Sequence, residues 1–218
     1  MRTLFIGDLH GCAEPFRRLL DTLSFDSATD RLFLTGDAFT KGPDPAGVWR
    51  LIGETGATMV LGNHDVNTLE WLREYVRGRQ SDVRTPDGHY TVDALSPVAG
   101  PVFNWLKSLP LWIEEDRFLL VHAGINPEKG LKNTSRDEFL AIRTWPPTGG
   151  LVGPRWHDAL PTDGKLIVFG HDAPGGLVVK RRTDGTPYVI GLDSGCVYGR
   201  SLSGYILEED RIIQVDRV

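Results

Sequence analysis

The sequence has few cysteines and no long apolar segment. Its two cysteines, Cys12 and Cys196, are too few for the disulfide framework of a small secreted domain. No run of 18 apolar residues occurs, which excludes a conventional membrane-spanning helix. The apolar run at residues 3–6 ends at once at Gly7-Asp8, so it is too short for a signal-peptide core. These absences predict a cytoplasmic protein without a membrane partner.

An excess of basic residues is also missing. The 24 lysines and arginines face 29 acidic residues, which gives a net charge of −5. This balance argues against a general nucleic-acid-binding surface, so we expect no stable nucleic-acid complex and only local attraction of an anionic substrate. The length of 218 residues suits a single domain over residues 1–218.

Hydrophobic periodicity predicts an α/β fold. In the first half, strand-like runs at 4–6, 31–35 and 58–61 are each followed by apolar residues at helical spacing, at 16–23, 48–52 and 65–76. After residue 111 the pattern is mainly that of strands, at 111–114, 118–121, 166–169, 177–180, 188–191, 204–207 and 211–215. We therefore expect two packed mixed β-sheets flanked by helices.

Two turn-rich stretches interrupt this pattern. Residues 77–100 are polar and carry three arginines, so we expect an irregular insertion that is either a cap over the site or a solvated loop. Residues 144–164 contain four prolines together with Trp145 and Trp156. These residues either form a wall of the substrate-binding site or pack against the core.

Short polar motifs follow several of the predicted strands. Because a sheet holds the side chains at its strand ends rigidly, distant motifs of this kind can assemble one site. The motifs are Gly-Asp-Leu-His-Gly at 7–11, Gly-Asp at 36–37, Gly-Asn-His-Asp at 62–65, His-Ala-Gly at 122–124, Gly-His at 170–171 and, more weakly, Asp-Ser-Gly-Cys at 193–196. Any one of them alone is more often a turn or a core residue. Together, the motifs indicate a metal site.

The motifs supply carboxylate, imidazole and amide groups without a thiolate. Such a set favours Mn²⁺, Fe, Co²⁺ or Zn²⁺ over Ca²⁺ or a soft metal. Two such ions about 3.5–4 Å apart form a clamp for in-line displacement at phosphorus. The candidate ligands are Asp8, His10, Asp37, Asn63, His122 and His171.

The motifs, in this order, resemble those of the phosphoprotein-phosphatase branch of the calcineurin-like metallophosphoesterases, over residues 4–207. The resemblance implies a four-layer α/β/β/α sandwich with two divalent ions, of which Mn²⁺ is the expected one. It implies Asp8 and His10 at one ion, Asp37 as the bridge, and a second ion held by Asn63, His122 and His171. It further implies that His64 is a general acid, with Asp65 as its supporting partner.

The second motif departs from that of the protein phosphatases, which read Gly-Asp-x-x-Asp-Arg-Gly. Here Thr40 and Lys41 replace the Asp, which orients the catalytic histidine in those enzymes, and the Arg, which grips phosphate. Without that carboxylate, His64 should protonate a serine alkoxide poorly. A phosphate leaving group, which ionises near about pH 6, needs less help. The ammonium group of Lys41 is a flexible point charge that suits a polyphosphate. Arg143 is then the candidate for binding a phosphate through the two donors of a planar guanidinium.

Several stretches resemble one subgroup, the symmetrical diadenosine tetraphosphate hydrolases and their related phosphatases. They are residues 62–65, 103–111, 122–125 and 192–199 with Leu202, together with the Lys-Gly-Pro of the second motif at 41–43. The resemblance implies cleavage of a dinucleoside tetraphosphate at its centre into two nucleoside diphosphates, or attack on related nucleoside polyphosphates or capped RNA ends. Asn63, Lys41 and Arg143 would bind the phosphates.

Two other functions remain open from the sequence. One is a Ser/Thr or Tyr protein phosphatase with the same metal site and a phosphoprotein as its partner. If the loss of the Asp at position 40 is what disfavours this alternative, Thr40→Asp should improve the hydrolysis of aryl and seryl monoesters. The other is a non-catalytic module that binds nucleotides or RNA ends.

Overall fold

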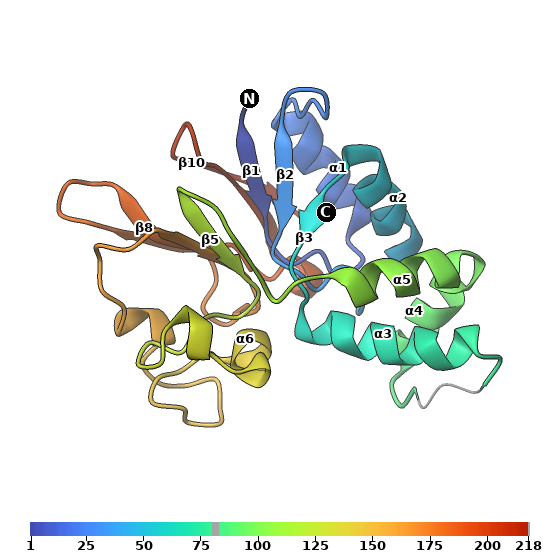
Figure 1. The fold of residues 1–218 in the computed structure, drawn as a ribbon. Helices are drawn as coiled ribbons and strands as arrows, with labels where there is room; N and C mark the ends of the chain where they lie inside the picture. The colour runs from blue at the N-terminus through green and yellow to red at the C-terminus, as the bar shows by residue number, and fades with distance from the viewer. Residues whose placement is uncertain (80–82, 218) are drawn as a thin grey trace.

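The chain, described by a computed structural model over residues 1–79 and 83–217, begins with three strand–helix units. A helical segment follows and leads into the second half (Figure 1). In order, these elements are β1 (Thr3–Ile6), α1 (Ala13–Thr22), β2 (Arg31–Leu34), α2 (Pro45–Thr55), β3 (Thr58–Met59), α3 (Asn63–Val76), α4 (Pro86–Leu95), η1 (Ser96–Val98) and α5 (Ala99–Ser108).

The second half is mainly β-structure with short helical turns between the strands. Its elements are β4 (Trp112–Glu114), β5 (Phe118–Val121), η2 (Leu131–Asn133), α6 (Arg136–Ala141), η3 (Trp156–Asp158), β6 (Leu166–Phe169), β7 (Val178–Arg181), β8 (Pro187–Gly191), η4 (Cys196–Tyr198), β9 (Ser201–Ile206) and β10 (Arg211–Asp216). No helix in the two described ranges is both long and apolar enough to cross a membrane.

Within the described ranges the strands form two five-stranded mixed sheets. One has the order β10-β9-β1-β2-β3, in which β1, β2 and β3 are parallel. The other has the order β4-β5-β6-β8-β7, in which β5, β6 and β8 are parallel. Parallel strands end at the same edge of their sheet, so the polar motifs that follow them are gathered there.

The first strand shows why the sheets are covered on both faces. Leu4 and Ile6 pack into the cluster beneath α1 and α2, whereas Phe5 points into the space between the sheets. There its ring stacks on Phe33 at 5.5 Å and meets Phe118 edge-on at 4.8 Å. Alternate residues of a strand point to opposite faces, so this wholly apolar strand is buried on both sides.

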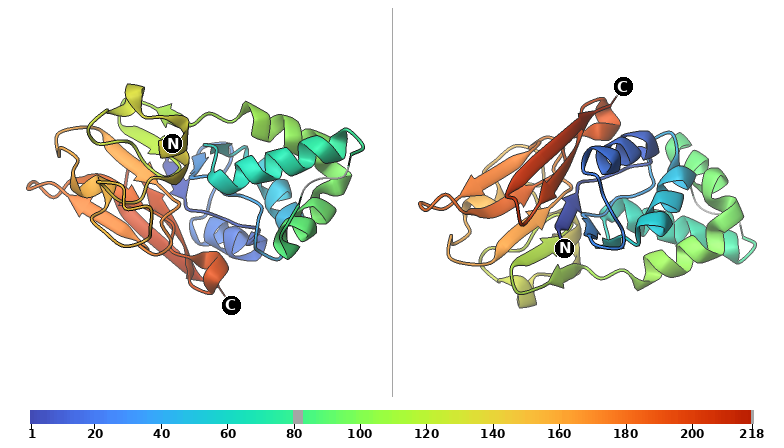
Figure 2. Two further views of the ribbon diagram at one scale, coloured as in Figure 1. Left: turned by 90° about the horizontal axis from the view of Figure 1, so that it is seen from below. Right: turned by 90° about the horizontal axis from the view of Figure 1, so that it is seen from above.

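The layers agree with the predicted sandwich. Helices α1 to α5 lie on one side of the paired sheets, as the two views in Figure 2 show. On the outer face of the second sheet, Phe139 of α6 and Trp156 of η3 belong to a third buried cluster. The two sheets and their helical flanks thus confirm the expected fold class.

The stretch 77–100 differs from expectation, because its described part is mainly helical. Thr85 caps α4 by accepting a hydrogen bond from the Gly88 amide, and Pro86 occupies the first helical turn. Helix α4 packs against α2 and α3. Residues 80–82 lie outside the described residues. The prediction of an irregular segment was wrong, because residues 85–88, although typical of a turn, form the capped start of a helix.

Candidate active site

Six loops from the two sheets meet at one buried cluster. Six motif residues in it are between 0% and 6% exposed: Asp8, His10, Asp37, His122, His171 and Asp193. Of these, His10, Asp37, His171 and Asp193 line a pocket of about 400 Å³. The motif residues directly follow strands: Asp8 after β1, Asp37 after β2, Asn63 after β3, His122 after β5, His171 after β6 and Asp193 after β8. Strand ends thus bring together all six motifs.

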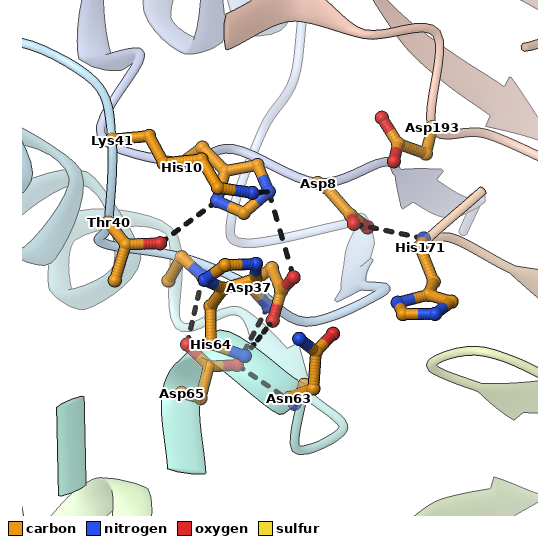
Figure 3. Close-up of polar contacts among 12 residues, drawn as sticks. Asp8, His10, Asp37, Thr40, Lys41, Asn63, His64, Asp65, His171 and Asp193 are labelled. Carbon is orange, nitrogen blue, oxygen red and sulfur yellow. Dashed lines mark hydrogen bonds and ion pairs between the residues drawn. The ribbon is translucent and has the colours of Figure 1, made fainter. Parts of the chain in front are cut away.

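Asp37 lies at the centre of the cluster (Figure 3). Its Oδ2 is 3.6 Å from Nε2 of His10 and 3.6 Å from Nε2 of His122. Two groups of possible ligand atoms, each within 4.8 Å of one another, share this carboxylate: Asp37 with His10 and His64, and Asp37 with His122 and His171. A carboxylate shared by two groups is the arrangement that a bridging ligand requires.

Asp8 belongs to neither group. One of its oxygens accepts a hydrogen bond from the Thr35 hydroxyl at 2.7 Å, and the other accepts from the His171 amide at 2.9 Å. These bonds fix the carboxylate between the two sheets. A carboxylate has about four lone-pair sites, so Asp8 retains the capacity to bind a cation.

His122 shows that the site fits a cation. Its Nδ1 lies 2.8 Å from the Thr35 carbonyl oxygen, which can only accept, so Nδ1 carries the proton. Nε2 therefore presents its lone pair, and it lies 3.0 Å from Oδ1 of Asn63. A shared cation would satisfy both atoms. Nε2 of His171 is likewise buried and has no hydrogen-bond partner among the described residues.

Burial disfavours the charged form of Asp8, Asp37, His10 and His64. Burial and the nearby carboxylate of Asp193 raise the pKa of Asp8, and burial together with Asp65 raises the pKa of Asp37. Burial lowers the pKa of His10. It also lowers the pKa of His64 to about 4, with Lys41 acting in the same direction. The imidazoles of His10 and His64 are therefore neutral at pH 7, and a histidine must be neutral to bind a metal.

Three candidate ligands have left-handed backbone conformations. The φ angles are 44° at His10, 54° at Asp37 and 65° at His171. Residues with a Cβ rarely adopt this region, and such strain is concentrated at functional sites.

Two glycines beside the ligands are required by close approach. A Cβ on Gly62 would lie 2.1 Å from Oδ1 of Asp37, and one on Gly170 would lie 2.0 Å from Oδ1 of Asp8. Both contacts are far inside van der Waals distance. The two carboxylates can therefore lie against the neighbouring backbone only because these positions are glycine.

Thr40 contacts His10 rather than His64. Its Oγ1 lies 3.2 Å from Nδ1 of His10, while His64 packs its ring edge-on against His10 at 5.0 Å. The loop after β2 thus places the Thr40 side chain beside His10 rather than beside His64. Lys41, the next residue, lies with Nζ 3.4 Å from Nε2 of His10.

Asp65 also differs from its expected role. It is fully buried, and its two oxygens accept hydrogen bonds from the backbone amides of Asp37, Ala38 and Gly62 at 2.7–2.9 Å. These bonds tie the loop after β2 to the start of α3. The structure thus places Asp65 as a positioning residue for Asp37, rather than as a partner of the His64 imidazole.

Arg143 lies on the pocket wall, as the phosphate-binding prediction requires. Its Nη2 donates to the His171 carbonyl at 3.2 Å, and its Nε lies 3.7 Å from Oδ1 of Asp172. Within residues 144–164, Leu151 also lines the pocket, whereas Trp156 is buried against Phe169. The stretch is therefore part wall and part packing.

The predicted site omitted three polar or charged residues that line the pocket. Asp193 is buried there, and Tyr198 and Arg200 follow it on the same loop. The sequence feature that could have predicted them is the sixth motif, at 193–196, which follows a strand as the other motifs do. No described residue between 83 and 100 lines the pocket.

The fold and this cluster are those of a phosphoesterase that uses divalent metal ions. The family model of the calcineurin-like phosphoesterases matches residues 1–207, and the chain belongs to this family of hydrolases.

The chain is similar in sequence to two bacterial proteins of the same name. A protein of Nitrosomonas europaea named "Bis(5'-nucleosyl)-tetraphosphatase, symmetrical" is 29% identical, over 99% of this chain and 98% of its own length. A protein of the same name from Chromobacterium violaceum is 31% identical, over 96% and 93%.

Solved structures show the same fold. One, described as a candidate diadenosine tetraphosphatase, has a TM-score of 0.76 and 31% identity, and covers 99% of this chain and 93% of its own. A serine/threonine phosphatase from Saccharomyces cerevisiae has a TM-score of 0.62 and only 15% identity, over 99% and 79%. The likeness to the second structure is one of fold alone.

Proposed function

We propose that this hydrolase cleaves dinucleoside tetraphosphates symmetrically into two nucleoside diphosphates. The observation that carries the proposal is the carboxylate of Asp37, shared by two ligand groups at the base of a pocket whose walls carry Lys41, Arg143 and Arg200. Three cations around one buried site suit a chain of phosphates better than a single phosphate ester. Relatives named for this activity align over nearly their whole length.

The residues present fit two divalent ions. We propose that Asp8, His10 and Asp37 hold one, and that Asp37, Asn63, His122 and His171 hold the other, with Mn²⁺ as the expected metal and Fe, Co²⁺ or Zn²⁺ as alternatives. When bound, the pair supplies Lewis acidity at phosphorus and a nucleophile derived from water.

The other residues bind and orient the substrate. Lys41 and Arg143 neutralise charge on the phosphates, and Asn63 contributes its amide at the same place. His64 lies beside His10 on the pocket wall, where it assists the departing diphosphate. A phosphate leaving group departs with little protonation, so the reaction demands less of His64 than ester cleavage would.

Product analysis tests the proposal. Mn²⁺-loaded protein is incubated with diadenosine tetraphosphate, beside a phosphopeptide and a metal-stripped control, and the products are separated by chromatography. We expect ADP as the sole product from the dinucleotide, at a rate well above that of the phosphopeptide. AMP with ATP would contradict symmetrical cleavage. Phosphopeptide turnover with the dinucleotide untouched would identify a protein phosphatase.

The substrate, the metal and the location in the cell each have a separate test. Capped RNA as the substrate is tested by adding it to the same assay, and a non-catalytic binding role predicts no turnover of any substrate. The metal used in the cell is tested by elemental analysis of native protein. Fractionation of cells that express the tagged chain tests the cytoplasmic location.

A further inference from the structure

The rim of the pocket carries a side chain that the phosphoryl chemistry does not use. Tyr198 lines the pocket at the end of η4, yet its surface is 62% exposed. A single exposed aromatic side chain is ordinary on a protein surface. Its meaning therefore depends on what holds the ring and on what lies beside it.

The Tyr198 ring is in contact with Lys41, which also contacts His10 in the cluster of candidate metal ligands. Nζ of Lys41 donates to the hydroxyl of Tyr198 at 3.1 Å and lies 5.5 Å from the ring centroid, within the range of a cation–π contact. The same nitrogen is 3.4 Å from Nε2 of His10. A continuous path thus leads from His10 through Lys41 to Tyr198, and the ring needs little further ordering before it binds a ligand.

The order of groups along this path matches that of a nucleotide. A phosphate bound at Lys41 beside His10 directs the sugar and base of the same nucleotide outward, along the wall that carries Tyr198. Pro174 and Arg200 line the same pocket, and Arg200 is fixed by a 3.4 Å hydrogen bond to the Ala173 carbonyl. A tyrosine ring, a proline ring and a planar guanidinium are all surfaces on which a base can stack.

We propose that Tyr198 is the stacking surface for one nucleobase of the substrate. The inference rests on the proposed function and deepens it, because it identifies the nucleoside as a part of the substrate that this pocket recognises. Every base has a π-face, so stacking of this kind accepts different bases. We therefore expect ADP and GDP to bind with similar affinity.

Binding of the product separates the base from the phosphates. ADP and inorganic pyrophosphate are titrated separately into Mn²⁺-loaded protein in a calorimeter, for the native chain and for Tyr198→Ala. Loss of one base–aromatic contact should weaken ADP binding about tenfold. Pyrophosphate has no base, so its affinity should be unchanged.

Two further variants control the measurement. Tyr198→Phe keeps the ring and should retain native affinity for ADP. Tyr75→Ala removes another tyrosine, which is 44% exposed on α3 and does not line the pocket, and should leave both ligands unaffected. The circular dichroism spectrum of each variant checks its fold.

Three outcomes would overturn the inference: equal weakening of ADP and pyrophosphate in Tyr198→Ala, unchanged ADP affinity in that variant, or no ADP binding by the native chain. The first outcome would mean that Tyr198 acts only through Lys41. Because binding is measured without turnover, the two proposals can fail separately. A chain that binds ADP through Tyr198 but leaves diadenosine tetraphosphate intact would refute the proposed function alone.

Discussion

Two of the candidate ligand histidines are oriented by an oxygen on the ring nitrogen that faces away from the cluster. Nδ1 of His122 donates to the Thr35 carbonyl, and Nδ1 of His10 lies 3.2 Å from the Thr40 hydroxyl. Such contacts fix the tautomer and the ring angle, and they raise the basicity of the nitrogen that binds the metal. We therefore expect Thr40, which replaces a family carboxylate, to act on metal binding in this chain.

Replacement of Thr40 by valine should weaken metal binding. The change keeps the shape of the side chain but leaves Nδ1 of His10 without its acceptor, and loss of such a partner typically costs about 10- to 100-fold in metal affinity or activity. Activity measured against Mn²⁺ concentration should show half-saturation shifted upward by that factor. Thr22→Val, on the exposed side of α1, is the matched control. An unchanged Mn²⁺ dependence would rule out this role for Thr40.

Replacement of Asp37 by asparagine tests the shared carboxylate. The amide keeps the shape but removes the charge that both ligand groups share, so we expect activity to fall by more than about 100-fold, beyond the loss typical of an outer partner. Elemental analysis after gel filtration should also show less bound metal. Asp26→Asn, at an exposed turn, should bind metal as the native chain does. Full metal content in Asp37→Asn would exclude Asp37 as the bridge.

At the scale of elements, the sequence predicted those with simple periodicity. The alternation of strand and helix up to residue 76 was recovered, as were the strand runs of the second half. Helices α4 and α5 were not predicted, because α4 begins with turn-like residues and the stretch that forms α5 was read only as a family motif. The role of Asp65 was also not predictable, since it depends on the amides of Asp37 and Ala38, which are 28 and 27 residues away in sequence. Such contacts leave no local pattern.

Helix α6 is short, and its start depends on Glu138. This carboxylate accepts hydrogen bonds from the backbone amide and hydroxyl of Ser135 at 2.8 and 2.9 Å, and from Nζ of Lys129 at 3.0 Å. The Ser135 amide, followed by the bonds from Asn126 and Lys129, lowers the pKa of Glu138 to about 2. A lowered pKa in the folded state stabilises the fold above the unfolded value, which is about 4.3, and this stabilisation is lost as the pH falls toward about 2.

Replacement of Glu138 by glutamine should therefore destabilise the protein in a pH-dependent way. At pH 7 we expect a loss of about 1 kcal/mol in the free energy of unfolding, because charge-assisted bonds become neutral ones. The difference from the native chain should narrow as the pH falls from 5 toward 3. Urea unfolding across this range measures it. Glu70→Gln, which removes an exposed ion pair with Arg73, should cost little at any pH. A gap that does not narrow would contradict the assignment to Glu138.

At the scale of the whole molecule, the site is divided between the two sheets. Asp8, Asp37 and Asn63 follow strands of one sheet, while His122 and His171 follow strands of the other. The distances within the cluster therefore depend on how the sheets pack, through Phe5, Phe33 and Phe118 between them. The sequence predicted that the six motifs would meet, because each of them follows a strand. It could not give their relative positions, which are set by packing between distant segments.

One buried histidine outside the cluster links the packing of the second sheet to pH. His157 in η3 is 4% exposed, packs against Trp156 and Phe169, and has no hydrogen-bond partner for either ring nitrogen among the described residues. Burial, with Lys180 adding to it, lowers its pKa to about 4. The unfolded chain therefore takes up this proton at a higher pH than the folded one, so stability is full above about pH 6.5 and falls as the pH drops toward 4.

Replacement of His157 by phenylalanine should remove this contribution. The ring keeps its contacts with Trp156 and Phe169, and nothing at the position can take up a proton. A tenfold difference in proton affinity is worth about 1.4 kcal/mol, so the native chain should lose more than about 1 kcal/mol relative to the variant between pH 7 and pH 4. Urea unfolding of both proteins at the same Mn²⁺ concentration gives this difference directly, because contributions from the other histidines are common to the two. Parallel curves across this range would show that the pKa of His157 is the same in the folded and the unfolded chain, and the acid sensitivity would then belong to the cluster between the sheets.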